Sequence, residues 1–224
     1  MLKNLLVAFS FTLSFSTAFA QVSEADRMEA QQLLQSNSAE LGLTGQDMEN
    51  SVITGSYIVP GSDVRIVHLQ QLYKGIKVYN QLHVLAFKNG QLASKAGSRI
   101  KAIESKAAGS AIPGIDPVKA VQTALREANT TATELIVPQN ISSEGHRFDF
   151  GNLGASSEKI FAELLWFPME NNSVKLVWQV FVAPYKTSDY WLMRVDAFTN
   201  TVISKENMTI SCNFGPLDKH DHAH

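Results

Sequence analysis

The 224-residue sequence lacks most of the features that identify a protein directly. It contains one cysteine, Cys212, which excludes an internal disulfide framework and any zinc site built from several cysteines. It has no excess of positive charge, because 19 Lys and Arg residues face 21 Asp and Glu residues and the formal net charge is −2. This balance argues against a nucleic-acid-binding protein. The length and the 45% hydrophobic content are typical of a folded chain with one domain or two small ones.

The sequence also lacks the short motifs of common catalytic sites. There is no His-Glu-x-x-His zinc motif, no Gly-x-Ser-x-Gly elbow, no P-loop and no Rossmann glycine pattern. We interpret His68, His83 and His146 as structural or surface residues, since none lies beside an evident partner or nucleophile in the sequence. We therefore expect no catalytic residues and no cofactor in this chain.

The C-terminal segment, residues 211–224, is polar and is expected to be a tail or a connector. No apolar pattern surrounds its histidines to fix ligand geometry, so they are weak candidates for a metal site. These weak candidates are His220, His222 and His224. Cys212 has two interpretations: pairing with a cysteine in another chain or in sequence not shown, or a buried unreactive thiol.

The first twenty residues have the pattern of a cleavable signal peptide. Lys3 supplies a positive charge, the stretch from Leu5 to Ala20 carries none, and Ala18-Phe19-Ala20 fits signal peptidase. A membrane anchor is the alternative, but the apolar run is short for a bilayer span and is diluted by Ser and Thr. We expect cleavage between Ala20 and Gln21 and an exported protein, extracellular or periplasmic. The membrane would then be a partner only during export.

The first half of the remaining chain predicts a helix followed by a β-meander. Ser23 and Asp26 suit a helix start, and Gly42 suits its end. Four stretches then follow a period of two, and turn dipeptides such as Pro60-Gly61 and Asn89-Gly90 separate them. The predicted elements are a helix over Ser23–Leu41 and strands over Ser51–Val59, Asp63–Tyr73, Ile76–Phe87 and Gln91–Ile100.

The second half predicts one helix laid on an antiparallel sheet. Residues 101–114, rich in Ala, Ser, Gly and Lys, are expected to form a linker. Asp116-Pro117 then starts a helix with an apolar face. Predicted strands cover Ile160–Phe167, Val174–Ala183, Asp189–Val195 and Thr201–Ile210. The expected fold class is α+β, with subdomains over residues 21–100 and 115–210.

Several motifs of the meander resemble the FTP domain, the propeptide module of fungalysin and thermolysin-like metallopeptidases. The family pattern is a Gln, an aromatic residue and Gly-hydrophobic-x-Val, followed by a strand and an x-Gly turn. The residues that match it are Gln71, Tyr73, Gly75, Val78, Asn80 and Asn89-Gly90.

The second half resembles a PepSY-like propeptide domain. Matching segments are Asp116-Pro-Val-Lys-Ala-Val121, Leu165-Trp166-Phe167, Leu176-Val177-Trp178-Gln179-Val180 and Trp191–Val202. The family usually has Asp-Ala-x-Thr-Gly where this chain has Asn200 in place of the glycine, and Asn also tolerates positive φ. This resemblance implies a PepSY/cystatin-like helix on an antiparallel sheet.

Together the two resemblances imply a proregion of a secreted zinc metallopeptidase. Such a proregion assists folding of the catalytic domain and blocks its cleft until it is removed. The implied partner is a cognate metallopeptidase catalytic domain, in cis or in trans, with no nucleic acid, and zinc is expected only in that absent domain. Candidate contacts are Gln71, Tyr73 and Asn80, whereas Gly75, Gly90 and Asn200 are expected at turns. The alternative is a free-standing secreted protease inhibitor or PepSY-type binding module.

Overall fold

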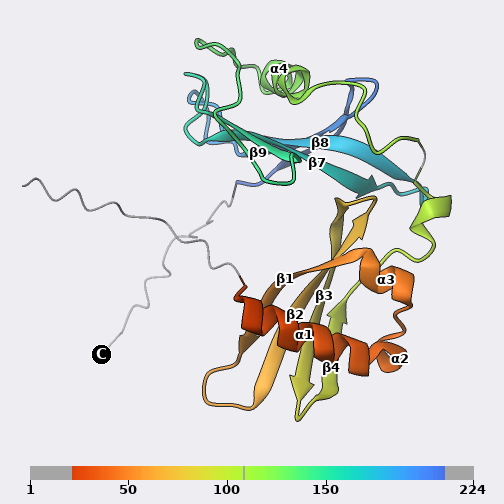
Figure 1. Ribbon diagram of the computed structural model, residues 1–224. Helices are drawn as coiled ribbons and strands as arrows, with labels where there is room; N and C mark the ends of the chain where they lie inside the picture. Colours follow the sequence, from red (N-terminus) through yellow and green to blue (C-terminus); the bar gives the residue numbers. More distant parts are fainter. Residues whose placement is uncertain (1–21, 108, 210–224) are drawn as a thin grey trace, which may run out of the picture.

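The computed structural model describes residues 22–107 and 109–209 and shows an α+β fold (Figure 1). A mostly antiparallel sheet of ten strands carries helices on its faces. The chain forms an N-lobe, residues 22–100, and a C-lobe, residues 101–107 and 109–209. The expected signal peptide with its Ala20–Gln21 cleavage site, Cys212 and the C-terminal histidines lie outside the described residues.

In the N-lobe, helix α1 covers one face of a four-stranded antiparallel meander in the order β1-β2-β3-β4. The four strands follow the predicted bounds closely. The predicted single helix is two helices, because the buried side chain of Asn37 interrupts it and bonds to the backbone at Gly90 and Leu92. The elements are α1 (Glu24–Ser36), α2 (Ser38–Leu41), α3 (Gly45–Glu49), β1 (Ser51–Ile58), β2 (Val64–Tyr73), β3 (Ile76–Lys88) and β4 (Gln91–Gly97).

The core of the N-lobe lies between α1 and the sheet. Alternation along β2 buries Arg65, Val67, Leu69 and Gln71 on one face, as the period of two predicts. The buried apolar cluster has nine residues: Ala30, Leu34, Leu41, Leu43, Ile53, Val67, Leu69, Leu85 and Phe87.

In the C-lobe, α4 covers the face of the sheet turned away from the N-lobe (Figure 1). Asp116 caps this helix by accepting a hydrogen bond from the Lys119 backbone, and Pro117 is its first residue. The elements are η1, a 3₁₀ turn (Ile103–Ser105), α4 (Pro117–Glu127), β5 (Asn140–Ile141), β6 (Arg147–Gly151), β7 (Ile160–Pro168), β8 (Val174–Val182), β9 (Trp191–Asp196) and β10 (Val202–Asn207).

Two parts of the C-lobe differ from the sequence-based expectation. The short β5–β6 hairpin was not predicted, because β5 has only two residues and too little pattern to detect. The segment expected as a linker is partly packed: Ile103 of η1 is buried in the C-lobe core, and Ala107 bridges to Val174.

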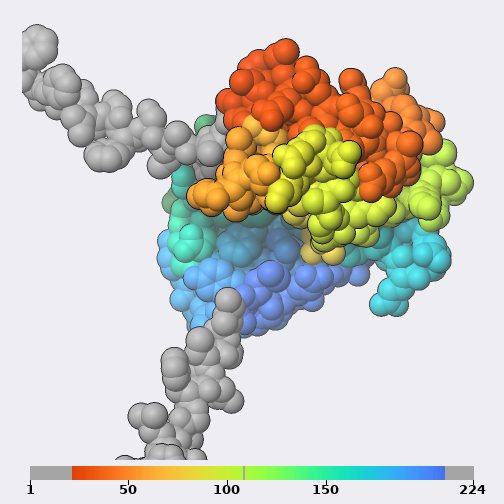
Figure 2. Space-filling view, turned by 90° about the horizontal axis from the view of Figure 1, so that it is seen from below, coloured from red at the N-terminus to blue at the C-terminus, as the bar shows by residue number. Residues whose placement is uncertain are grey.

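The lobes meet where the β2–β3 hairpin enters the C-lobe. Val78 of β3 pairs with Trp166 of β7 in parallel orientation, which joins the two sheets. The indole Nε1 of Trp166 donates a hydrogen bond to the Tyr73 carbonyl oxygen at 2.9 Å. Ile76 and Val78 belong to the C-lobe core. The N-lobe lies against part of the C-lobe, and the part of the C-lobe near the C-terminal end of the described chain extends beyond the N-lobe (Figure 2).

Candidate functional site

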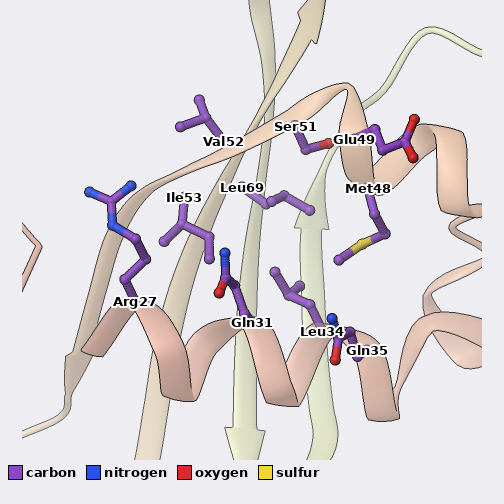
Figure 3. Close-up of a pocket in the computed structure, with 10 residues that line it drawn as sticks. All are labelled: Arg27, Gln31, Leu34, Gln35, Met48, Glu49, Ser51, Val52, Ile53 and Leu69. Atoms are coloured by element: carbon purple, nitrogen blue, oxygen red, sulfur yellow. The ribbon is translucent and has the colours of Figure 1, made fainter. Parts of the chain in front are cut away.

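A groove of about 440 Å³ lies between α1, α3 and strand β1 (Figure 3). We call it the edge groove. Leu34, Ile53 and Leu69 form an apolar floor, and all three are buried. The other lining residues are Arg27, Gln31, Gln35, Met48, Glu49, Ser51 and Val52.

The edge groove runs along the open side of β1. Ser51, Val52 and Ile53 are consecutive and all line it, although neighbouring side chains in a strand point to opposite faces. A groove that touches all three must therefore follow the strand edge. Among the described strands β1 pairs only with β2, so every second residue presents its N–H and C=O groups away from the sheet.

Arg65 fixes α1 beside β1. Its guanidinium donates to Asp26 at 2.7 Å and to Glu29 at 2.5 Å, both on α1, and to the Ser56 hydroxyl of β1 at 2.9 Å. Burial lowers the pKa of Arg65, but the bond to Asp26 and the charge of Glu29 outweigh it, so the pKa is raised. Hydrogen bonds from Ser23 and then from Arg65 lower the pKa of Asp26. These ionic contacts hold one wall of the groove.

Asp47 and Arg99 fix the opposite end of the groove. Thr44 and Asp47 form a capping box at the start of α3. Arg99 bonds to the Asp47 carboxylate at 2.9 Å and to the Ser51 hydroxyl at 2.8 Å. Burial raises the pKa of Asp47, but hydrogen bonds from Thr44 and the charge of Arg99 outweigh it, so the pKa is lowered.

The rim of the edge groove carries one cation and one anion. Arg27 of α1 and Glu49 of α3 both line it and are drawn on different sides of the cavity (Figure 3). Neither side chain has an ion-pair or hydrogen-bond partner in the part of the chain that the structure describes. Gln31 and Gln35 of α1 are exposed between them.

A second cavity, of about 290 Å³, lies between the lobes. We call it the inter-lobe pocket. Glu163 of β7 pairs there with Lys77 of β3 at 3.0 Å and with Arg147 of β6 at 3.7 Å. The lining residues are Val52, Thr54, Leu72, Gly75, Lys77, Ser142, Glu144, His146, Arg147, Glu163 and Leu164.

The three residues proposed from sequence as partner contacts occupy different environments. Gln71 is 2% exposed, and its side-chain amide bonds at 2.9 Å to both the N–H and the carbonyl of Ile100. Tyr73 is half-buried against Trp166, and Asn80 is exposed with φ +55°. Partner contact through these residues stays a prediction, and for Gln71 the structure shows only bonds within the chain.

The expected turn positions adopt left-handed backbone conformations. Gly75, Gly90 and Asn200 have φ values of +78°, +79° and +59°, at the β2–β3, β3–β4 and β9–β10 turns.

Sequence reasoning did not identify the edge groove. Arg27, Gln31, Leu34 and Gln35 recur at helical spacing and share one face of α1. That spacing is the signal that was available, but it does not reveal that this face borders the open edge of β1.

Residues 22–107 and 109–209 contain no group of three or more His, Cys, Asp or Glu side chains arranged to hold a metal ion. None of their helices is both long enough and apolar enough to span a bilayer.

No protein-family model matches the sequence, and none of the curated proteins matches it. Among solved structures, the fold is distantly similar to the YpeB C-terminal domain of Bacillus megaterium, with 12% identity and a TM-score of 0.36 over 88% of this chain and 71% of that one. It is also distantly similar to a Clostridium difficile 630 protein described as a candidate lipoprotein, with 9% identity and a TM-score of 0.26 over 77% of this chain and 91% of that one. Both similarities are too low to assign a family.

Proposed function

We propose that this protein is an exported, non-catalytic binding module that recognises an extended segment of a partner protein. The observation that carries the proposal is the edge groove, which combines an apolar floor with the open edge of β1. Strand addition at a sheet edge supplies main-chain hydrogen bonds, and adjoining pockets for side chains supply specificity.

The rim charges define the chemistry of the recognised segment. A segment lying along β1 places an apolar side chain over Leu34 and Ile53, between Arg27 and Glu49. An acidic side chain next to Arg27 and a basic side chain next to Glu49 complement this rim. The preferred segment is therefore extended, with an apolar residue between residues of opposite charge.

The partner that we propose is the catalytic domain of an exported zinc metallopeptidase. The support for it is the order of FTP-like and PepSY-like motifs in the sequence, not the comparisons with known proteins. If the module and the catalytic domain belong to one chain, the linkage raises the effective concentration of each for the other, so that a modest affinity between them is sufficient. A reading frame that continues beyond His224 into a domain with His-Glu-x-x-His would favour a proregion over a free-standing inhibitor or binding module.

The binding proposal can be tested with a positional-scanning library of acetylated nonapeptides, in which each position carries Leu, Glu or Lys in turn. Gln31→Trp fills the edge groove from an exposed position of α1 and should abolish binding measured by fluorescence anisotropy. Gln32→Trp is the matched control, because Gln32 is exposed but does not line the groove. Equal binding by the two variants would refute the proposal.

Charge reversal tests the role of the rim. Arg27→Glu should shift the preference at one peptide position from Glu to Lys, and Glu49→Lys should shift another from Lys to Glu. Unchanged preferences would show that Arg27 and Glu49 do not select the charge of the bound peptide.

The metallopeptidase partner needs its own assay. The purified protein, mixed with a mature exported zinc peptidase of the same source, should inhibit cleavage, and Gln31→Trp should not. Unchanged peptidase activity with both proteins would exclude inhibition of that enzyme.

A further inference from the structure

We propose that the inter-lobe pocket is a second subsite for the same bound segment, so that consecutive side chains enter the edge groove and the inter-lobe pocket alternately. This inference rests on the proposed binding along β1, and it adds that both lobes read one segment.

The geometry of β1 supports this arrangement. Val52 lines both cavities, so they meet at this residue of the strand edge. Ile53 lines only the edge groove, and Thr54, where the register with β2 shifts between Ile53 and Gly55, lines only the inter-lobe pocket. The two cavities thus open on opposite sides of one strand edge. An added strand beside the regular part of β1, up to Ile53, alternates as β1 does there, and its successive side chains point toward these two sides.

The inter-lobe pocket is lined by two cations, Lys77 and Arg147, and two anions, Glu144 and Glu163, so its charges balance. Lys77 and Arg147 both pair with Glu163, whose side chain is only 17% exposed. The Arg147 guanidinium also lies 3.8 Å from the centre of the Phe161 ring, which fixes its position. Leu72 supplies apolar surface to the pocket. Unlike the rim of the edge groove, this pocket therefore suits an uncharged apolar side chain.

The recognised pattern follows from the two cavities together. The side chains of the segment that face the edge groove are charged, apolar and charged at alternate positions. The side chain at the neighbouring position, which faces the inter-lobe pocket, is apolar. The central part of the segment thus carries two consecutive apolar residues, one of which enters each cavity. Such a segment is a strand from a partner protein with charged residues on one side only.

The test applies the same nonapeptide library to variants at exposed positions. Thr54→Trp fills the inter-lobe pocket, and Ser94→Trp on β4 is the matched control, since Ser94 is exposed and lines neither cavity. The unmodified protein should prefer Leu at two consecutive positions by about tenfold each. Thr54→Trp should lose the preference at one of them and keep the other, and Ser94→Trp should keep both.

A second variant, which should gain a preference and not lose one, distinguishes loss of the subsite from misfolding of Thr54→Trp. Lys77→Ala removes one of the two cations paired with Glu163, and it should raise the preference for Lys at the position that Thr54→Trp affects. Unchanged selectivity in both Thr54→Trp and Lys77→Ala would overturn the second subsite while leaving binding at the edge groove intact.

Two other outcomes separate this inference from the proposed function. Unchanged binding by Gln31→Trp would overturn both, because the segment would then not lie along β1. A dimer seen by light scattering and lost in Gln31→Trp would make a second copy of this chain the occupant, and it would overturn the partner segment proposed here.

Discussion

Each lobe buries one arginine on a sheet face, but the two arginines lie in different surroundings. Arg65 in the N-lobe bonds through its two terminal nitrogens to two carboxylates of α1, Asp26 and Glu29, and to the hydroxyl of Ser56, and only its Nε has no partner among the described residues. It joins a helix to its own sheet. Its partners are accessible to water, because the side chains of Asp26 and Glu29 are 37% and 55% exposed.

Arg194 in the C-lobe lies against two aromatic rings that also contact each other. Its guanidinium is 4.5 Å from the ring centre of Tyr79, on β3, and 5.0 Å from that of Phe167. It pairs with Glu206, but its Nε and Nη2 atoms have no hydrogen-bond partner among the described residues. It therefore joins the two lobes mainly through stacking on aromatic faces.

The helices of the two lobes also differ in how much apolar surface they bury. Helix α1 buries only Ala30 and Leu34, so apolar contact alone holds it weakly. Helix α4 buries five residues, four of them apolar, and Arg126 near its end is exposed. The N-lobe thus depends on ionic anchoring, whereas the C-lobe has a core of 24 buried apolar residues. Substitutions that remove apolar contacts should affect the C-lobe most, and substitutions of charges should affect the N-lobe most.

The largest effect is expected for Trp166→Ala, which should lower the free energy of unfolding by about 3–5 kcal/mol. Trp166 is fully buried, and its loss creates a cavity and removes the bond to the Tyr73 carbonyl. Urea denaturation measures the change. Trp191→Ala is the control at a half-buried tryptophan, and an equal loss in the two variants would contradict the special position of Trp166.

Arg65→Met should destabilise the protein by about 2 kcal/mol, because it leaves the buried Ser56 hydroxyl without its charged partner and detaches α1. Hydrogen exchange should rise in α1 and not in α4. Faster exchange in both helices would show that the lobes unfold together.

Arg194→Met should change stability by less than about 1 kcal/mol, although Arg194 is more deeply buried than Arg65. An apolar side chain of similar length keeps the packing against Tyr79 and Phe167, and replacement of a buried ion by such a residue is often neutral. The same denaturation experiment compares the two variants, and a greater loss for Arg194→Met would reverse the comparison.

Acid should weaken both lobes, because each contains a partly buried carboxylate with a lowered pKa, Asp47 in the N-lobe and Asp196 in the C-lobe. The pKa of Asp196 is lowered: burial opposes this, but hydrogen bonds from Lys175 and from the Phe198 and Thr199 backbone outweigh it. The pKa of Asp47 is also lowered, as described above. A folded-state pKa below the unfolded value of about 3.9 gives stability that is present above pH 4 and is lost as the pH falls through the folded pKa.

The urea midpoint should therefore fall below about pH 4. Asp47→Asn and Asp196→Asn should each make that fall shallower, because an amide does not titrate. A slope identical to that of the unmodified protein would show that the carboxylate in question keeps its ordinary pKa.

The smallest effect is expected for an exchange of turn residues between the lobes. Gly90→Asn and Asn200→Gly should each change stability by about 0.5 kcal/mol or less, since both residue types tolerate positive φ. Gly90→Val is the contrasting variant, because a β-branched side chain is strained there and should lower the thermal midpoint clearly. Equal midpoints for Gly90→Asn and Gly90→Val would show that the turn does not depend on backbone conformation.

Much of each lobe was predictable from local patterns. The period of two placed Arg65, Val67, Leu69 and Gln71 on one face of β2, and the structure shows that this face is the buried one. The cap residues Asp116 and Pro117 marked the start of α4 correctly. The break at Asn37 was not predictable, because its side chain bonds to the backbone of Gly90 and Leu92, more than fifty residues away.

The candidate site was less accessible to sequence reasoning than the fold. Its residues come from α1, α3 and β1, and each of them resembles an ordinary surface or core position when read alone. Gln71 illustrates the reverse case, since it matched a family motif but its amide bonds to the Ile100 backbone inside the protein.

The sequence by itself determined the α+β class, the meander, the helix on the second sheet and the turns, because hydrophobic period, caps and backbone preferences act over a few residues. Only the tertiary structure decided that β3 pairs with β7, that the edge of β1 stays open beside α1, and that Val52 separates two cavities. These features depend on contacts between residues far apart in the chain, and no local pattern encodes which distant surfaces meet.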